Sequence, residues 1–428
     1  MSDILIASSV VMLVLLFLKV PVFISVLGGS LVYFIMNPAV NPVIFAQQTI
    51  LGTEKIALLA IPFFVCAGIV MNYAGVTNRI MNFCEMITGK LPGGLAQVNV
   101  MLSTVMGGLS GSNLADAAME SKMLVPEMTK KGFSLEFSSV VTAASSMITP
   151  LIPPGIAMIL YGCIANVSIG KLFVSGIGIG SLLCVTMMIL VGIISKKRGY
   201  GILTQEKMTS ERFFGALKPA FLPLLLPIII IGGIRIGIFT ATEAGAVAIL
   251  YAMLLGFMYK TMKTSDIAKA LKETAAITSS ILLIVAAASV FSWILTRERV
   301  PQTLTTWMLS TIDNKYVFLI VVNIFLLIVG MFIEGNASMI ILVPLLAPIA
   351  ASYGINDIHF AMIYIFNNAI GALSPPMGTL MFVTCAITKC KTAAFIKEAI
   401  PFYILLLINL FLITYFEPFA TFLVKLIY

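Results

Sequence analysis

Two pairs of short breaks interrupt otherwise apolar sequence, and their residue types suit the binding of a small cation. The first pair is GLSGSN at 108–113 and EGNAS at 334–338, where glycine lets the backbone reverse and Ser and Asn supply oxygen atoms. The second pair is the double prolines Pro153-Pro154 and Pro375-Pro376. Hard cations such as Na⁺ take oxygen ligands. The four breaks together therefore predict a cation site.

The double prolines also free backbone carbonyl groups, because proline has no N–H to donate. The carbonyls four residues earlier lose their helical partners, and these belong to Thr149, Pro150, Gly371 and Ala372. At membrane depth such carbonyls are tolerated only where protein or a water-lined cavity satisfies them. One such break indicates a simple kink, but two breaks at matching positions favour a binding site.

Four acidic residues lie within apolar sequence, where a charge is costly and usually functional: Asp116, Glu120, Glu243 and Glu334. Glu334 adjoins the second polar break, so it is a candidate for contact with a cation or a polar substrate. Asp116 follows the first break and is also placed to cap a helix, and Glu243 is interpreted as bracing a helix start. Arg235 and the cluster at 297–299 are interpreted as helix-end anchors rather than carboxylate ligands.

The composition predicts an all-α polytopic membrane protein. Of 428 residues, 60% are hydrophobic and only 10% are charged, whereas globular proteins carry about 25% charged residues. A spanning helix needs about 20 mostly apolar residues, and the apolar runs supply about ten or more such helices. Long continuous runs exclude a β-barrel, whose segments alternate. Too little exposed charge remains for disorder or for nucleic-acid binding, so the net charge of +8 indicates membrane orientation.

The sequence offers little for enzymatic chemistry. One histidine, His359, leaves no His-rich metal site, and the six cysteines form no CxxC pair, so we expect buried free thiols and no organic cofactor. The stretch GLSGS at 108–112 resembles the GxSxG nucleophile elbow, but Ser112 stands where the last glycine belongs. We therefore expect a protein that is not an enzyme.

The chain repeats itself at an offset of 222 residues, which places Ser145-Ser146 on Asn367-Asn368 and the first double proline on the second. Repeats with broken segments at matching positions are typical of secondary transporters. We predict a first repeat over 1–194, a cytoplasmic loop over 195–218 and an inverted second repeat over 219–428. The basic stretch 259–273 is expected on the same side as that loop. The uncharged stretch 37–50 is expected on the outer face, and Lys19 favours an N-terminus on the outer side.

Each repeat is expected to hold one re-entrant hairpin and one broken helix. The hairpins are predicted at about 93–130 and 316–352, and the broken helices at about 136–165 and 358–390. An ordinary loop between two full spans is the alternative at the second break, because Tyr316–Ile333 is long enough to cross alone.

Longer motifs carry a resemblance to a known family. The stretches at 61–80, 93–128, 140–162, 237–252 and 330–349, among them GGLSGSNLADAAMESKMLVPEM and GMFIEGNASMIILVPLLAPI, resemble the large membrane subunit of tripartite ATP-independent periplasmic (TRAP) transporters. The resemblance implies a small four-helix membrane subunit and a periplasmic substrate-binding protein as partners, with membrane lipid around the chain. It also implies Na⁺-driven import of an organic acid, by an elevator mechanism, across the bacterial inner membrane. The moving transport domain is then expected to comprise mainly 93–170 and 316–392, with the remainder as scaffold.

The resemblance further implies which residues bind two or more Na⁺ ions. One set comprises Ser110, Ser112, Asn113, Ser145, Thr149, Pro150 and Gly155. The second set comprises Gly335, Asn336, Gly371, Ser374, Met377 and Thr379. Substrate contact is implied for Glu334, which stands where relatives often carry Asp, together with Ser110, Ser112, Asn113 and Asn336.

The substrate and the class leave alternatives open. The hydroxyl and amide groups at the breaks favour a polyhydroxylated acid such as sialic acid over a C4-dicarboxylate, which is the main alternative substrate. A one-component Na⁺/dicarboxylate symporter would need no partner subunit. An intramembrane hydrolase would need a catalytic pair that the spacing does not offer, and a passive channel is a third alternative.

Overall fold

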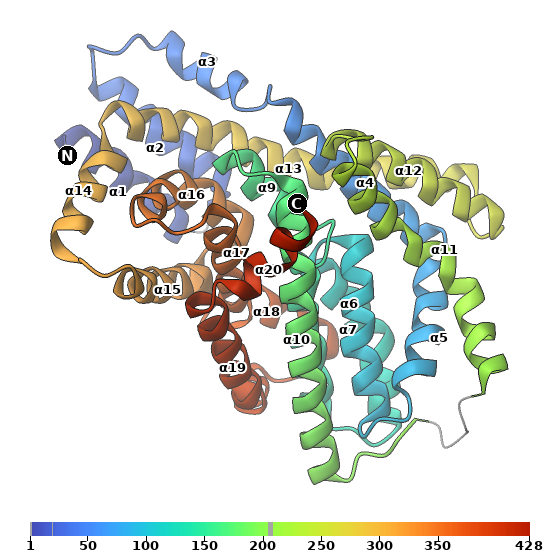
Figure 1. Ribbon diagram of the computed structural model, residues 1–428. Coiled ribbons are helices and arrows are strands. Elements are labelled where there is room, and N and C mark those ends of the chain that lie inside the picture. Colours follow the sequence, from blue (N-terminus) through green and yellow to red (C-terminus); the bar gives the residue numbers. More distant parts are fainter. Residues whose placement is uncertain (1, 19, 204–208) are drawn as a thin grey trace.

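The computed structural model describes residues 2–18, 20–203 and 209–428, and every regular element in these ranges is a helix (Figure 1). This confirms the all-α fold class. Eight helices there are long and apolar enough to cross a membrane, or nine if one bent pair counts as a span. That is fewer than the ten or more expected, because several apolar runs form short helices. Lys19 and part of the expected loop 195–218 lie outside the described residues.

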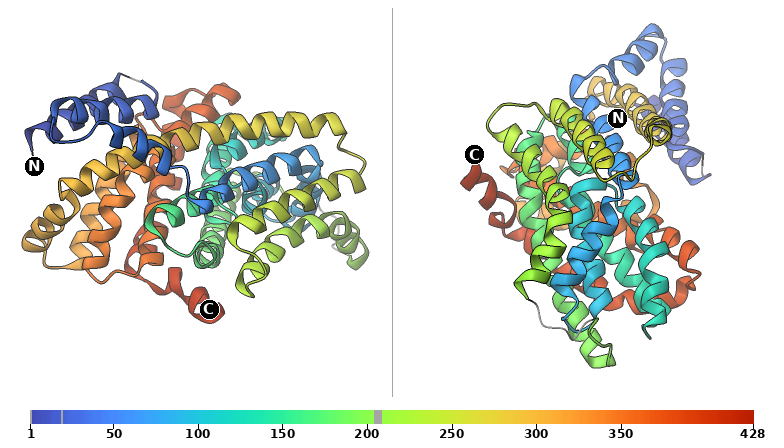
Figure 2. Two further views of the ribbon diagram at one scale, coloured as in Figure 1. Left: turned by 90° about the horizontal axis from the view of Figure 1, so that it is seen from above. Right: turned by 90° about the vertical axis from the view of Figure 1, so that its right-hand side faces the viewer.

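The first two helices lie together at one end of the molecule (Figure 2), and the chain then runs toward its middle. The helices of this part are α1 (Asp3–Phe17), α2 (Val22–Met36), α3 (Val43–Leu51), η1 (Ile56–Leu59), α4 (Ala60–Tyr73) and α5 (Val76–Thr88). Close packing of α1 on α2 depends on Gly29, whose carbonyl accepts a 2.7 Å hydrogen bond from Ser8. A side chain at Gly29 would meet Met12. The two 15-residue helices therefore pack as a pair.

The next helices carry the first polar break and the first double proline. They are α6 (Gly94–Ser110), α7 (Asn113–Lys130), α8 (Leu135–Ser145), η2 (Ser146–Leu151), α9 (Ile156–Ala165) and α10 (Ile169–Arg198). One face of α10 exposes Val185, Ile189 and Ile193, four residues apart. An apolar row at this spacing is one face of a helix, and it suits contact with lipid.

Four helices separate this group from its counterpart: α11 (Ser210–Arg235), α12 (Ala241–Met258), α13 (Thr264–Arg297) and α14 (Val300–Thr311). At the start of α12, Thr240 and Glu243 form a reciprocal capping box, which confirms a structural role for Glu243. Arg235 ends α11 and Arg297 ends α13, as expected of helix-end anchors. Glu298 accepts hydrogen bonds from Tyr33 (2.5 Å) and Ser2 (2.8 Å). These charges therefore join helix ends.

The second group repeats the order of the first, which is a hairpin, a broken helix and a long helix. The second group comprises α15 (Lys315–Phe332), α16 (Gly335–Ser352), α17 (Asp357–Leu373), α18 (Thr379–Thr388) and α19 (Thr392–Tyr415), followed by α20 (Pro418–Ile427). Equivalent polar pairs lie in both groups: Ser145 bonds Asn99 at 3.0 Å, and Asn367 bonds Asn323 at 2.7 Å. The 222-residue repeat thus has a structural counterpart, and inversion stays a prediction.

Candidate functional site

The first polar break is a tight turn between α6 and α7. Gly111 caps α6 with φ +62°, a left-handed conformation that favours glycine. A side chain there would also lie 2.6 Å from the Pro154 carbonyl. The Gly111 carbonyl in turn accepts a hydrogen bond from the N–H of Ile156 (3.3 Å). The turn is therefore packed directly against the double-proline segment.

The first double proline separates η2 from α9, and the two parts of this broken helix are bent by 42°. The peptide bond Pro153-Pro154 is cis, as is Pro375-Pro376 in the second group. The Thr149 carbonyl is not free, contrary to our expectation, because the N–H of Ile152 donates to it (3.3 Å). The short η2 helix supplies this partner through its tighter bonding pattern.

Asp116 has a different role from the helix cap that we considered. Ser112 caps α7 by accepting from the N–H of Ala115. The Asp116 carboxylate instead accepts hydrogen bonds from the hydroxyls of Ser110 (2.6 Å) and Thr149 (2.5 Å). It thereby ties the end of α6 to η2.

The second polar break lies between α15 and α16. Glu334 caps α16: its carboxylate accepts from the N–H of Ala337 (3.1 Å) and from the Asn336 amide (3.0 Å). The Asn368 amide on α17 donates to the Gly335 carbonyl (2.7 Å). Gly371 packs against Gly330, and its carbonyl accepts from the N–H of Ser374 (3.0 Å). This break, like the first, is packed against a broken helix.

The two breaks meet in one small cavity of about 70 Å³. Four helices begin at its walls, namely α7, α9, α16 and α18, which contribute the lining residues Asn113, Ile156, Gly335 and Thr379. Ser112, Pro150, Glu334 and Asn336 also line this cavity. The cavity therefore brings together predicted site residues from both repeats: Ser112, Asn113 and Pro150 from the first, and Glu334, Gly335, Asn336 and Thr379 from the second.

A larger cavity of about 390 Å³ adjoins the same breaks and reaches two helices outside them. Ser110, Ser112, Glu334 and Asn336 line one side. The other side is formed by α4 and α13 and includes Gly68, Asn72, Ile277, Ser280 and Ile284. This space is large enough for a small organic acid.

Several predicted residues lie away from both cavities. Ser145 is buried and bonds Asn99, Thr149 bonds Asp116, and Gly155 starts α9 against Pro150. In the second group Gly371 packs on Gly330, Ser374 donates to the Ile370 carbonyl (2.8 Å), and Met377 is 41% exposed. None of these six lines either cavity among the described residues.

Three polar residues at the site were not among the predicted ligands. Asn368 lines the small cavity, and Asn72 and Ser280 line the large one. The repeat gave a signal for Asn368, because it aligns with Ser146 beside the double proline. Nothing in the local sequence distinguishes Asn72 or Ser280, since their proximity depends on how α4 and α13 pack.

The charge distribution at the site favours an anion accompanied by cations. Among the described residues that line the two cavities, Glu334 is the only charged one. Helix N-termini carry partial positive charge and helix C-termini partial negative charge. Four N-termini suit a carboxylate, while the Pro150 carbonyl and the end of α6 suit a cation. A substrate anion beside Glu334 nevertheless needs further compensation, because like charges in a buried site repel.

Long apolar helices around a polar cavity, built at helix breaks from two repeated groups, define a polytopic membrane transporter. The family model "Tripartite ATP-independent periplasmic transporter, DctM component" matches residues 9–419. The chain belongs to this TRAP family, as its large membrane subunit. It is therefore a multi-pass protein of the bacterial inner membrane and not an enzyme.

Individual relatives agree with this assignment. The chain is 40% identical over 413 residues to the sialic acid TRAP transporter large permease protein SiaM of Vibrio cholerae, covering 96% of each chain. It is 36% identical to the sialic acid TRAP transporter permease protein SiaT of Haemophilus influenzae, covering 97% of this chain and 68% of that one. The crystal structure of the Alcanivorax borkumensis YdaH transporter has the same fold, with a TM-score of 0.60, 13% identity and 87% coverage of each chain.

Proposed function

We propose that the protein imports an organic acid, sialic acid in the first place, together with Na⁺ by an elevator mechanism. A periplasmic binding protein delivers the substrate, and a small four-helix membrane subunit completes the permease. The observation that carries this proposal is the convergence of four helix N-termini from both repeats on one cavity beside Glu334.

Na⁺ would be held by oxygen atoms at the two breaks. In the first repeat the available groups are the side chains of Ser112 and Asn113 and the Pro150 carbonyl. In the second repeat they are the amide of Asn336 and the hydroxyl of Thr379. Bound Na⁺ supplies positive charge where the described cavity walls carry none. It therefore offsets both Glu334 and the substrate carboxylate.

An elevator movement is supported by the composition of the larger cavity. One wall consists of the breaks and the other of α4 and α13, which lie outside the expected transport domain of 93–170 and 316–392. If the breaks move as a block against α4 and α13, a substrate bound at Ser110 and Asn336 travels with them. Na⁺ binding would order the breaks, so that a loaded block moves and a half-loaded block does not.

Sialic acid is favoured by the hydrogen-bonding groups at the cavity. Ser110, Ser112 and Asn336 offer hydroxyl and amide groups to a polyhydroxylated acid, and Glu334 accepts from substrate hydroxyls. Two similar relatives are named for sialic acid. A C4-dicarboxylate, the alternative substrate, would place a second negative charge near Glu334.

The experiment is uptake into proteoliposomes that contain both membrane subunits and the binding protein. We expect sialic acid uptake to require Na⁺ and to stop when K⁺ or choline replaces it. Undiminished uptake in choline would contradict Na⁺ coupling. Uptake of a C4-dicarboxylate in preference to sialic acid would transfer the proposal to the alternative substrate.

The binding residues are tested by Asn113→Ala and Asn336→Ala. Each variant should raise the Na⁺ concentration for half-maximal uptake by about tenfold, equivalent to about 1.4 kcal/mol for one lost ligand. Asn314→Ala is the matched control, because Asn314 is exposed and caps α15 away from both cavities. Wild-type Na⁺ curves for both site variants would refute the assignment.

A further inference from the structure

A buried chain of hydroxyl groups lies behind the first break and ends on Glu120. Glu120 on α7 is fully buried. Its Oε2 lies 2.7 Å from the hydroxyl oxygen of Ser103, and its Oε1 has no hydrogen-bond partner. No Lys, Arg or His forms an ion pair with Glu120 within the described part of the chain. A carboxyl group in such surroundings is costly if it carries a charge.

The chain continues from Ser103 through Ser145 to Asn99. The two serine oxygens are 2.9 Å apart, and Ser145 Oγ lies 3.0 Å from Asn99 Oδ1. The Asn99 amide nitrogen donates to Thr142 Oγ1 (2.6 Å), and Thr142 donates its own hydrogen to the Ser138 carbonyl (2.9 Å). Since the Ser138 carbonyl can only accept, Thr142 spends its hydrogen there and accepts from the Asn99 amide nitrogen, which leaves the Asn99 amide oxygen facing Ser145.

Counting hydrogens along the chain fixes the remaining directions. The single hydroxyl hydrogen of Ser145 has two acceptors in reach, Asn99 Oδ1 (3.0 Å) and the Thr142 carbonyl (3.1 Å), and neither of these oxygens can donate. Ser145 then has no hydrogen left for Ser103, and Ser103 must donate to Ser145. Ser103 has thereby used its only hydrogen. The short contact between Ser103 and Glu120 then requires that Glu120 donates.

The opposite arrangement leaves two groups unsatisfied. If Glu120 were ionised, Ser103 would donate to it and Ser145 would donate to Ser103. Asn99 Oδ1 would then be a buried acceptor without a donor, and Glu120 would be a buried charge with one bare oxygen. Each of these defects destabilises a buried network.

We propose that Glu120 is a proton-binding site, a neutral carboxylic acid that donates its proton to Ser103 and orders the hydroxyl chain to Asn99. The titratable groups near Glu120 favour this state. Asp116 lies one turn earlier on α7, and the buried Cys84 on α5 interacts with Glu120. Asp116 accepts two hydroxyl hydrogens, and negative charges on both carboxylates at this i,i+4 spacing would repel each other.

The proton at Glu120 has a consequence for any moving block. The block would carry one buried carboxylate on α7 instead of two, and Ser145 would keep its hydrogen directed at Asn99. Glu120 lines neither cavity, so its protonation can be measured in the absence of Na⁺ and of substrate.

Infrared difference spectroscopy of the purified protein tests the proposal directly. We expect the carbonyl stretch of a protonated carboxyl group in the wild type, and its loss in Glu120→Gln. Ser103→Ala, which removes the hydrogen-bond acceptor, should shift the band without abolishing it. Asp116→Asn is the matched control and should leave the band in place.

Thermal unfolding gives a second measurement. Gln at 120 can donate to Ser103 as the neutral acid does, so Glu120→Gln should melt within a few degrees of the wild type. The proposal is overturned if Glu120→Gln removes carboxylate bands and leaves the protonated carbonyl band unchanged. A Ser103→Ala spectrum with an unshifted band would equally refute the donor direction.

Discussion

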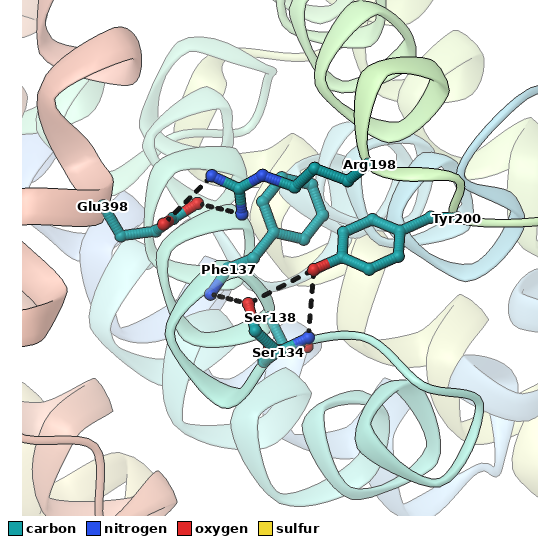
Figure 3. Close-up of polar contacts among 6 residues, drawn as sticks. All are labelled: Ser134, Phe137, Ser138, Arg198, Tyr200 and Glu398. Atoms are coloured by element: carbon teal, nitrogen blue, oxygen red, sulfur yellow. Dashed lines mark hydrogen bonds and ion pairs between the residues drawn. The ribbon is translucent and has the colours of Figure 1, made fainter.

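Arg198 and Glu398 join the two repeated groups through a two-pronged ion pair, with N–O distances of 2.7 and 3.2 Å (Figure 3). Arg198 ends α10, and Glu398 lies on α19. The guanidinium also lies 5.5 Å from the centre of the Phe137 ring on α8. Nearby, Tyr200 accepts a hydrogen bond from the backbone N–H of Ser134, which caps α8 (3.2 Å). Three helices are therefore held together at this end.

Breaking this ion pair should destabilise the protein modestly. The Arg198 side chain is 39% exposed and Glu398 17%, so water screens part of the attraction, and we expect a loss of about 1 kcal/mol for Arg198→Gln. Thermal unfolding should show a lower Tm and a smaller difference from the wild type at high salt. The double variant with Glu398→Gln should lose less than the sum of the single variants. Additive losses would show that the two residues do not interact.

Gly111→Ala should disrupt the first break for two separable reasons. A left-handed residue other than glycine costs about 1–2 kcal/mol, and the new methyl group would press on the Pro154 carbonyl. Gly132→Ala is the matched control, because Gly132 also has a positive φ (+88°) but open space around it. We expect both variants to lower Tm, and only Gly111→Ala to abolish uptake. Equal uptake in the two would mean that the packed turn is dispensable.

Asn368→Ala should affect ion binding through the Gly335 carbonyl. The lost amide donor frees that carbonyl at the wall of the small cavity, and a hydrogen bond of this kind contributes about 1 kcal/mol. The Na⁺ dependence of uptake should shift several-fold. Asn367→Ala is the comparison, because Asn367 bonds Asn323 and lines neither cavity. It should lower Tm and leave the Na⁺ dependence unchanged, and the reverse pattern would exclude a role for Asn368 at the site.

Na⁺ alone should stabilise the protein in the absence of substrate. A ligand at a hundred times its Kd stabilises the folded state by about 2.7 kcal/mol. We expect a higher Tm in NaCl than in choline chloride at equal ionic strength, and a smaller difference in Asn113→Ala. Identical melting in the two salts would exclude a preformed Na⁺ site.

The helix breaks were predictable from sequence because glycine and proline impose local backbone constraints. The double prolines at 153 and 375 mark the broken helices, and Gly111 marks the first turn. The roles of the buried carboxylates were harder to predict from sequence. Asp116 has the position of a helix cap in sequence, yet its partner Thr149 comes from a segment 33 residues away. Only the packing of η2 against α7 brings the two together.

Residues within continuous apolar helices gave no sequence signal. Ser103 and Asn99 lie inside α6, and their partners Glu120 and Ser145 come from α7 and α8. A polar residue in a spanning helix can face lipid, a neighbouring helix or a cavity, and periodicity alone does not separate these cases. The predicted number of membrane-spanning helices was too high, because apolar runs such as those of α1 and α2 form helices of only 15 residues each.

Four helices begin at the walls of the small cavity, so most of the positive electrostatic potential there comes from main-chain peptide groups. Partial charges on peptide groups do not titrate, and along the described walls Glu334 is the one side chain able to gain or lose a proton. Acidifying the medium therefore leaves most of the attraction for an anion in place. Redesigning such a pocket for a different cargo means changing its shape, since no lysine or arginine in those walls is available to be exchanged.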